Sequence, residues 1–262
     1  MVFMGAALTG CMRKHRGTIE LPETTAEAVQ TDDLTEIVIE IETEAQTEAE
    51  AKQDLSVGSC LTPREVETAR ADRFFYQEAI SDEIWKRMDG NSYRPGCPVP
   101  VEDLRYLRVL HYDYDGRIRV GELVADKSVS DDLLSIFRRL FEAQYPIEKM
   151  ILIDEYGGDD ELSSSDNNTS CFNYRTVAGT QRLSRHALGT AIDINPVYNP
   201  YVTADEEGTI ICTPSNGSAY IDRSAVFDHK IDEDDLCCRL FVEYGFTWGG
   251  SWAEPDYMHF SR

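Results

Sequence analysis

Two short stretches that lie far apart in the sequence place the strongest constraint on how this chain folds. The first runs from Ser184 to Pro196 and carries His186 and Asp193. The second lies close to the C-terminus and carries His259. Imidazole nitrogen and carboxylate oxygen are common zinc ligands, and a catalytic zinc site combines three protein ligands with one open position. The pattern therefore predicts that the fold brings His186, Asp193 and His259 together around Zn²⁺.

The residues around Asp193 predict how this carboxylate is presented. Ile192 and Ile194 flank it, so a strand here would bury the two isoleucines on one face and direct Asp193 to the other. The small residue Gly189 would let the backbone pass close to the metal. Two neutral imidazoles and one carboxylate would leave zinc electrophilic enough to bring the pKa of its water toward ~7.

Length and charge limit the classes of protein that need to be considered. The 262 residues, 42% of them hydrophobic, suffice for one large domain or for one domain and a tail. The net charge of -23 argues against nucleic acid as a partner, because phosphate binding needs a basic face.

The N-terminal residues 1–17 contain a candidate lipidation site. The apolar run before Cys11 is too short to span a bilayer. However, the sequence from Leu8 to Cys11 resembles the lipobox of bacterial lipoproteins, in which the cysteine receives a lipid. Residues 1–17 are therefore predicted to be the remnant of a lipoprotein signal, with lipid on Cys11 and a location in the cell envelope, either periplasmic or membrane-anchored. The alternative is an apolar N-terminus without a lipid.

Residues 18–56 predict an acidic, disordered tether. They are dominated by Glu, Thr and Ala and contain no aromatic residue, so they cannot bury enough surface to offset the entropy of ordering. The remainder, residues 57–262, is predicted to be one domain. If Cys11 is set aside, the other six cysteines could form disulfides in an oxidising compartment, although Cys237 and Cys238 are adjacent and one of them fits a core position better.

Periodicity within residues 57–262 predicts both helices and hairpins. Helices are expected over Asp72–Met88, from a Ser130 cap to Pro146, and over Asp232–Tyr244. Strands are expected over Leu104–Tyr112, Arg117–Val124, Met150–Ile153, Phe246–Trp248 and Met258–Phe260. Long irregular stretches are expected at 156–180 and 199–224. Because helices and hairpins segregate instead of alternating, the predicted fold class is α+β.

Taken together, several motifs resemble one family. The pattern Ser-x-His-x-x-Gly-x-Ala-x-Asp at 184–193 is followed by a late Asp-x-x-His at 256–259. The stretches 172–175, 193–196, 199–202 and 245–250 add to the resemblance, which extends from about Asp103 to Phe260. The chain is thereby similar to the zinc peptidases that act on bacterial cell-wall stem peptides. This family contains the D-Ala-D-Ala carboxypeptidases and dipeptidases and the L-alanyl-D-glutamate endopeptidases.

The resemblance implies a fold, a ligand set and a mechanism. The expected fold is that shared with the Hedgehog signalling domain, an antiparallel sheet with flanking helices. Zinc is expected on His186, Asp193 and His259, with Asp256 as the general base and Arg175 near the substrate carbonyl. The carboxypeptidase and dipeptidase branches typically carry Glu at the place of Asp256, whereas the endopeptidases carry Asp, which favours an endopeptidase.

Each assignment has a simpler structural alternative. Asp256 could be a turn residue after Pro255, and Arg175 could brace a loop through an ion pair. Ser184 is predicted to contact substrate but could cap the turn before His186. Trp248 and Trp252 are predicted to line the cleft but could pack in the core instead.

The prediction for the whole protein is a zinc metallopeptidase acting on peptidoglycan stem peptides, as an L-Ala-D-Glu endopeptidase or a D-Ala-D-Ala carboxypeptidase. The alternative is a non-catalytic, zinc-containing module that binds peptidoglycan or protein.

Overall fold

The computed structural model describes residues 56–69, 73–177 and 180–262. These residues fall in a compact unit that spans Ala49–Arg262. Cys11, the segment 1–17 and the predicted tether up to residue 55 lie outside the described residues. Within the described ranges, no helix combines the length and the apolar character needed to cross a membrane.

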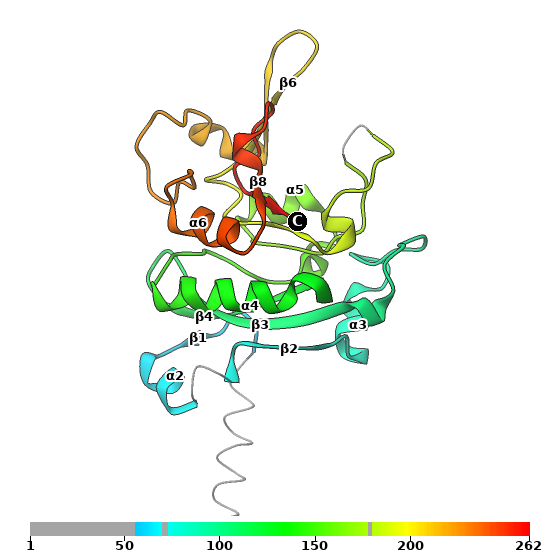
Figure 1. Ribbon diagram of the computed structural model, residues 1–262, viewed down its shortest axis with the longest axis vertical. Coiled ribbons are helices and arrows are strands. Elements are labelled where there is room, and N and C mark those ends of the chain that lie inside the picture. The colour runs from blue at the N-terminus through cyan, green and yellow to red at the C-terminus, as the bar shows by residue number, and fades with distance from the viewer. Residues whose placement is uncertain (1–55, 70–72, 178–179) are drawn as a thin grey trace, which may run out of the picture. The chain divides into compact units, whose positions relative to one another are not determined.

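A four-stranded antiparallel sheet with the order β1-β4-β3-β2 is built around one long hairpin (Figure 1). Its strands are β1 (Cys60–Leu61), β2 (Tyr76–Ala79), β3 (Leu104–Tyr112) and β4 (Ile118–Asp126). In the hairpin, β3 and β4 pair from Leu104 with Asp126 to Tyr112 with Ile118. In the turn between them, Asp113 accepts hydrogen bonds from two backbone N–H groups of the loop. The hairpin predicted from the sequence is confirmed.

Helix α4 (Lys127–Glu142) lies along this sheet and faces α6 (Leu236–Glu243) on its other side (Figure 1). It begins earlier than the predicted Ser130 cap, because Asp126 caps it by accepting a hydrogen bond from Ser128 N at 2.8 Å. Its inward face is buried, with Leu133, Ile136, Phe137 and Leu140 each at most 1% exposed. The main hydrophobic core therefore joins the sheet, α4 and the C-terminal elements.

The C-terminal strands form two smaller antiparallel sheets. One has the order β5-β9-β8 and consists of β5 (Ala191–Asp193), β8 (Thr247–Trp248) and β9 (His259–Ser261). The other is a hairpin of β6 (Tyr201–Ala204) and β7 (Ile210–Thr213) that projects from the rest of the unit (Figure 1). The two strands predicted near the C-terminus are confirmed, and the hairpin lies in the stretch 199–224 that was predicted to be irregular.

Short helices complete the described unit. The α-helices are α2 (Pro63–Ala69), α3 (Asp82–Met88) and α5 (Asp160–Ser165). The 3-10 turns are η2 (Val101–Asp103), η3 (Ile153–Tyr156), η4 (His186–Leu188), η5 (Ser215–Tyr220) and η6 (Gly249–Ser251). Helix α5 lies inside the predicted loop 156–180, and α6 is shorter than the predicted Asp232–Tyr244 because Asp235 is its N-cap.

Two predicted elements are wrong. The first half of the predicted helix Asp72–Met88 is strand β2, which pairs with the free edge of β3, and the helix starts only after the Ser81 cap. Sheet pairing has overridden the local helical periodicity here. The predicted strand Met150–Ile153 is an irregular extended segment, in which Ile151 N donates to the side chain of Asn168 at 2.9 Å.

The described unit is thus a mixed α/β structure with antiparallel sheets. The particular Hedgehog-like fold stays a prediction. The six cysteines within the described residues are all free, and Cys237 and Cys238 are both buried on α6.

Candidate metal centre

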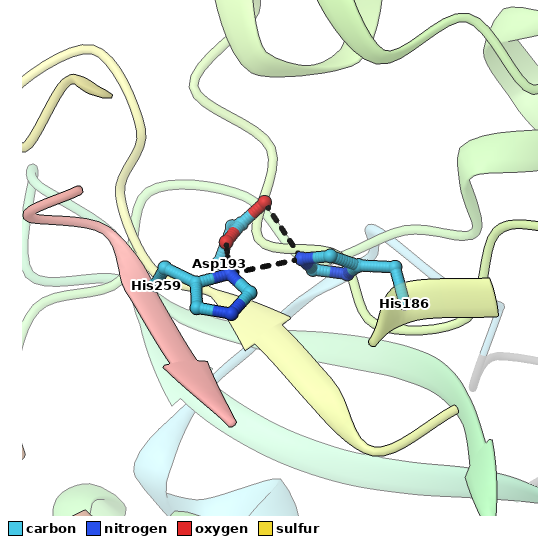
Figure 2. A group of neighbouring side chains, drawn as sticks. All are labelled: His186, Asp193 and His259. Atoms are coloured by element: carbon cyan, nitrogen blue, oxygen red, sulfur yellow. Dashed lines mark hydrogen bonds and ion pairs between the residues drawn. The ribbon is translucent and has the colours of Figure 1, made fainter. Parts of the chain in front are cut away.

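Asp193 and His259 meet because their strands place them directly opposite each other. In the antiparallel pair β5–β9, Asp193 is the partner of His259, so both side chains leave the sheet on the same face. The flanking Ile192 and Phe260 are fully buried on the core face, as the alternation of the sequence predicted. The Nδ1 atom of His259 lies 3.0 Å from Oδ1 of Asp193 (Figure 2).

His186 reaches the same point from the 3-10 turn η4. Its Nδ1 atom lies 2.6 Å from the carbonyl oxygen of Cys171. A carbonyl oxygen only accepts, so Nδ1 carries the proton and Nε2 presents its lone pair. Nε2 of His186 lies 3.2 Å from both Asp193 Oδ2 and His259 Nδ1 (Figure 2). A second hydrogen bond of this kind orients most histidines that bind metal.

The backbone of residues 170–173 supports both His186 and Asp193. Ser170 exchanges two backbone hydrogen bonds with Asp193, at 3.0 and 3.2 Å. Cys171 provides the carbonyl for His186, and Asn173 N donates to the His186 carbonyl oxygen at 3.1 Å. These contacts are made by the backbone and are therefore invisible to residue-type patterns. Residues 172–175 had entered the family resemblance, but their residue types gave no sign of these backbone contacts.

Two glycines let neighbouring backbones approach closely. A Cβ atom at Gly249 would lie 2.6 Å from the carbonyl oxygen of Asp256 and 3.3 Å from the Cβ atom of His259. A Cβ atom at Gly189 would lie 2.6 Å from the backbone nitrogen of Asp126, and its φ of 69° favours glycine as well. Gly189 thus permits a close approach to the start of α4, whereas its predicted role was a close approach to the metal.

The arrangement fits a metal ion. One ligand atom from each of His186, Asp193 and His259 lies within 4.8 Å of the others. The two imidazoles are buried and the carboxylate is nearly so. Burial opposes ionisation of Asp193, but the two imidazoles outweigh it and hold the pKa of this carboxyl well below its usual range. Two nitrogens and one ionised oxygen are a donor set that zinc accepts readily, and three protein ligands leave a position open.

Asp256 lies beside this group, at the turn that precedes β9. Its carbonyl oxygen accepts from His259 N at 3.3 Å, and its N–H donates to Gly249 O at 3.1 Å. Its Oδ1 atom is buried and has no hydrogen-bond partner within the described residues. Burial raises the pKa of Asp256 to about 7; the charge of Asp193 adds to the rise, whereas His259 and Arg175 oppose it. A carboxyl group with such a pKa can exchange protons near neutral pH.

Arg175 was predicted to lie near the substrate carbonyl, with a loop-bracing ion pair as the alternative. Its Nε atom forms an ion pair with Oδ2 of Asp160 on α5, so the bracing contact is present. Its positive charge also acts on Asp256, which places it in the electrostatic environment of the metal centre. The backbone of Arg175 also contacts the turn before His186, because its carbonyl oxygen accepts a hydrogen bond from Ser184 N at 3.1 Å.

The structure places the two predicted substrate contacts in supporting positions. The hydroxyl oxygen of Ser184 accepts from His186 N at 3.2 Å, which matches the capping alternative. The indole of Trp248 donates from Nε1 to Tyr257 O at 2.9 Å and packs against the main core. Trp252 is the indole beside the ligands: its ring centroid lies 5.2 Å from that of His259, and the residue is 42% exposed.

Comparison with known proteins agrees with this site. Residues 178–262 match the sequence model of a family described as D-alanyl-D-alanine carboxypeptidase. The matched range contains all three candidate ligands and Asp256, and it confirms the resemblance derived from the motifs. The match supports a peptidase. No curated protein and no solved structure matches the chain.

Proposed function

We propose that this protein is a zinc-dependent peptidase that hydrolyses an amide bond in peptidoglycan stem peptides. The observation that carries the proposal is the convergence of His186, Asp193 and His259 next to Asp256, a half-buried residue whose Oδ1 atom is buried and unpaired within the described residues. The family match over residues 178–262 supports it independently of the geometry.

Zinc would be held by Nε2 of His186, Nδ1 of His259 and the carboxylate of Asp193. When bound, the ion supplies Lewis-acid chemistry: it polarises a carbonyl group and lowers the pKa of water. The hydrogen bond from His186 Nδ1 to Cys171 O keeps the ligand nitrogen unprotonated, and the Asp193–His259 register fixes the other two donors.

The remaining chemistry belongs to the side chains. Asp256 accepts a proton from the attacking water molecule and delivers it to the leaving amine, which requires a carboxyl group whose pKa lies near the working pH. The guanidinium of Arg175 donates hydrogen bonds to the carbonyl oxygen, where negative charge develops during attack. The indole of Trp252 covers one side of His259 and limits the access of bulk water.

The scissile bond is the finer part of the proposal. Asp256, in place of the Glu that is typical of the carboxypeptidase branch, favours an L-alanyl-D-glutamate endopeptidase. The description of the matching family favours a D-Ala-D-Ala carboxypeptidase instead. We propose the endopeptidase as the first candidate, because residue 256 is the one that meets the reacting atoms.

Mass spectrometry of digested muropeptides tests the proposal and separates the candidates. Cleavage between L-Ala and D-Glu identifies an endopeptidase, and loss of the terminal D-Ala identifies a carboxypeptidase. Unchanged muropeptides after incubation with zinc-loaded protein would contradict a peptidase and favour a binding module.

The cell-envelope location is proposed separately, on the lipobox-like sequence that ends in Cys11. A lipid on Cys11, followed by the acidic segment 18–56, would let the peptidase domain reach the cell wall from a membrane surface. Membrane fractionation of cells that express the wild type or the Cys11→Ser variant tests this. Equal recovery of both proteins in the soluble fraction would contradict lipidation.

A further inference from the structure

Asp160 stands at the start of α5, where its carboxylate is not needed as a helix cap. The cap is the preceding residue, Asp159, whose Oδ1 accepts from Leu162 N at 3.0 Å. Instead, both carboxylate oxygens of Asp160 contact the segment that follows Cys171. Oδ2 pairs with Nε of Arg175, and Oδ1 accepts from Nδ2 of Asn173 at 3.1 Å.

The ion pair between Asp160 and Arg175 leaves the two Nη atoms of the guanidinium available. A guanidinium is a rigid planar fork with five N–H groups, so fixing its Nε edge also fixes where its two Nη atoms point. The Nε atom of Arg175 is buried and meets Asp160 as an ion pair without the geometry of a hydrogen bond, and within the described parts of the chain neither Nη atom forms a hydrogen bond. Two oriented donors therefore remain for an oxygen atom of a substrate.

The same ion pair is tied to the metal centre through the backbone. Asn173, which shares the Asp160 carboxylate, donates from its N–H to the carbonyl oxygen of His186. Arg175 accepts a hydrogen bond from Ser184 N, two residues before His186. A side chain anchored on α5 is therefore held in a defined relation to the turn that carries a candidate ligand.

Asp160 also competes with the acidic groups of the site for the same cation. Asp256 and Asp193 lie close enough together for their charges to interact, and Asp256 interacts with Arg175 as well. A guanidinium without Asp160 would be drawn toward these carboxylates and would occupy the space that a substrate carbonyl needs.

We propose that Asp160 is a positioning residue, which holds Arg175 by its Nε edge so that the two Nη atoms face the substrate carbonyl oxygen. The inference rests on the proposed peptidase function and adds a residue that lies outside the range matched by the family model.

Steady-state kinetics on muropeptides with a pentapeptide stem test this role. Asp160→Asn is expected to lower kcat/KM by about 100-fold, mainly through kcat, because a misplaced group near the reacting atoms costs about that much. Asp160→Glu keeps the charge and should recover part of the loss. Asp159→Asn is the matched control: it removes a neighbouring charge, keeps a capping side chain and should stay within about two-fold of the wild type.

A double-mutant comparison shows whether Asp160 acts through Arg175. Arg175→Lys removes the Nε edge, so adding Asp160→Asn to it should change kcat/KM by no more than about two-fold. Losses that multiply in the double variant would overturn the proposal, as would an Asp160→Asn variant with wild-type kinetics.

A measurement that does not depend on turnover separates this inference from the proposed function. In ¹⁵N-edited NMR spectra, the Nε–H of Arg175 should give a signal that exchanges slowly with water, identified by its absence from Arg175→Lys. The signal should persist in Asp159→Asn and be lost in Asp160→Asn. If the wild type cleaves no muropeptide, the peptidase proposal fails, while this signal still decides whether Asp160 holds Arg175. An unchanged signal in Asp160→Asn overturns the inference at any level of activity.

Discussion

His186 and His111 are two buried histidines with the same first contact and different second contacts. Each ring places Nδ1 2.6 Å from a backbone carbonyl oxygen, that of Cys171 for His186 and that of Ile147 for His111. Nε2 of His186 then faces Asp193 and His259, whereas His111 lies on β3 of the large sheet and belongs to no group of potential metal ligands within the described residues. Burial lowers the pKa of His111 to about 4, which keeps it neutral. Burial and a backbone contact thus do not identify a ligand; the surroundings of the second nitrogen do.

Two buried carboxyl groups repeat the contrast. Glu122 on β4 is fully buried and accepts from Arg87 at 2.9 Å, from the Tyr106 hydroxyl at 2.9 Å and from Leu152 N at 3.2 Å. Asp256 leaves Oδ1 without a partner among the described residues. Because an unpaired buried polar atom is costly, its presence beside three candidate ligands indicates a group kept for chemistry. Glu122 on the large sheet has partners for its carboxylate oxygens, whereas Asp256 beside the metal centre keeps one oxygen available.

The largest expected effect comes from exchanging each histidine for alanine. His186→Ala should lose stoichiometric metal and reduce muropeptide cleavage to the background rate, because three ligands become two. His111→Ala should lower the free energy of unfolding yet keep both metal content and activity. Elemental analysis of the purified proteins, together with urea unfolding, measures the two effects. Full metal content in His186→Ala would show that the ligand assignment is wrong.

The carboxyl pair gives the next largest effect. Asp256→Asn should keep its metal and lose about 10²- to 10⁴-fold in kcat, which is the usual contribution of a general acid–base group. Glu122→Gln should act on stability instead, by about 2–4 kcal/mol, because it breaks a buried pair whose arginine is partly exposed. Turnover kinetics and urea unfolding distinguish the two. A strongly active Asp256→Asn enzyme would exclude Asp256 as the base.

Asp256 should also shape the pH dependence of stability in the metal-free protein. Its pKa rises from 3.8 to about 7 on folding, so between these values the folded state binds more protons than the unfolded state. Stability conferred by the protonated form is therefore present at low pH and is lost as the pH rises toward 7. In the presence of a chelator, the wild type should lose more stability than Asp256→Asn between pH 5 and pH 7.5.

Gly249 beside the metal centre and Gly121 in the large sheet extend the comparison of the two regions to the backbone. Gly249→Ala should lower metal affinity and cut kcat/KM by about 100-fold, because its Cβ atom would meet backbone of Asp256 at 2.6 Å and displace both the base and His259. Gly121→Ala in β4 would meet only the side chains of His111 and Met150, at 3.0 to 3.2 Å. It should cost about 1–3 kcal/mol of stability and leave the metal centre intact. Metal titration and thermal unfolding of both variants test this; equal activity losses would contradict it.

The strands that carry Asp193 and His259 could be predicted because the alternation of buried and open positions is a local pattern. Their pairing, which places the two side chains opposite each other, was expected from the family resemblance and not from local structure. The hairpin of β3 and β4 is a local pattern with a turn. By contrast, the contact of Asp160 with Arg175, the carbonyl of Cys171 and the pairing of β2 with β3 arise from tertiary proximity. Trp248 and Trp252 are the same residue type in one motif, and only packing decides which lies beside His259.

Ser184 gives the smallest expected effect, and it could either support the metal centre or recognise the substrate. Its hydroxyl oxygen accepts from the buried His186 N–H, so Ser184→Ala should cost about 1 kcal/mol of stability and leave KM unchanged. Ser130→Ala is the control, since it removes a hydroxyl that contacts only Lys127 O within α4. If Ser184 instead binds substrate, its alanine variant will raise KM with little loss of stability. Unfolding and kinetic measurements on the same two variants therefore assign Ser184 either to the support of the metal centre or to the recognition of the substrate.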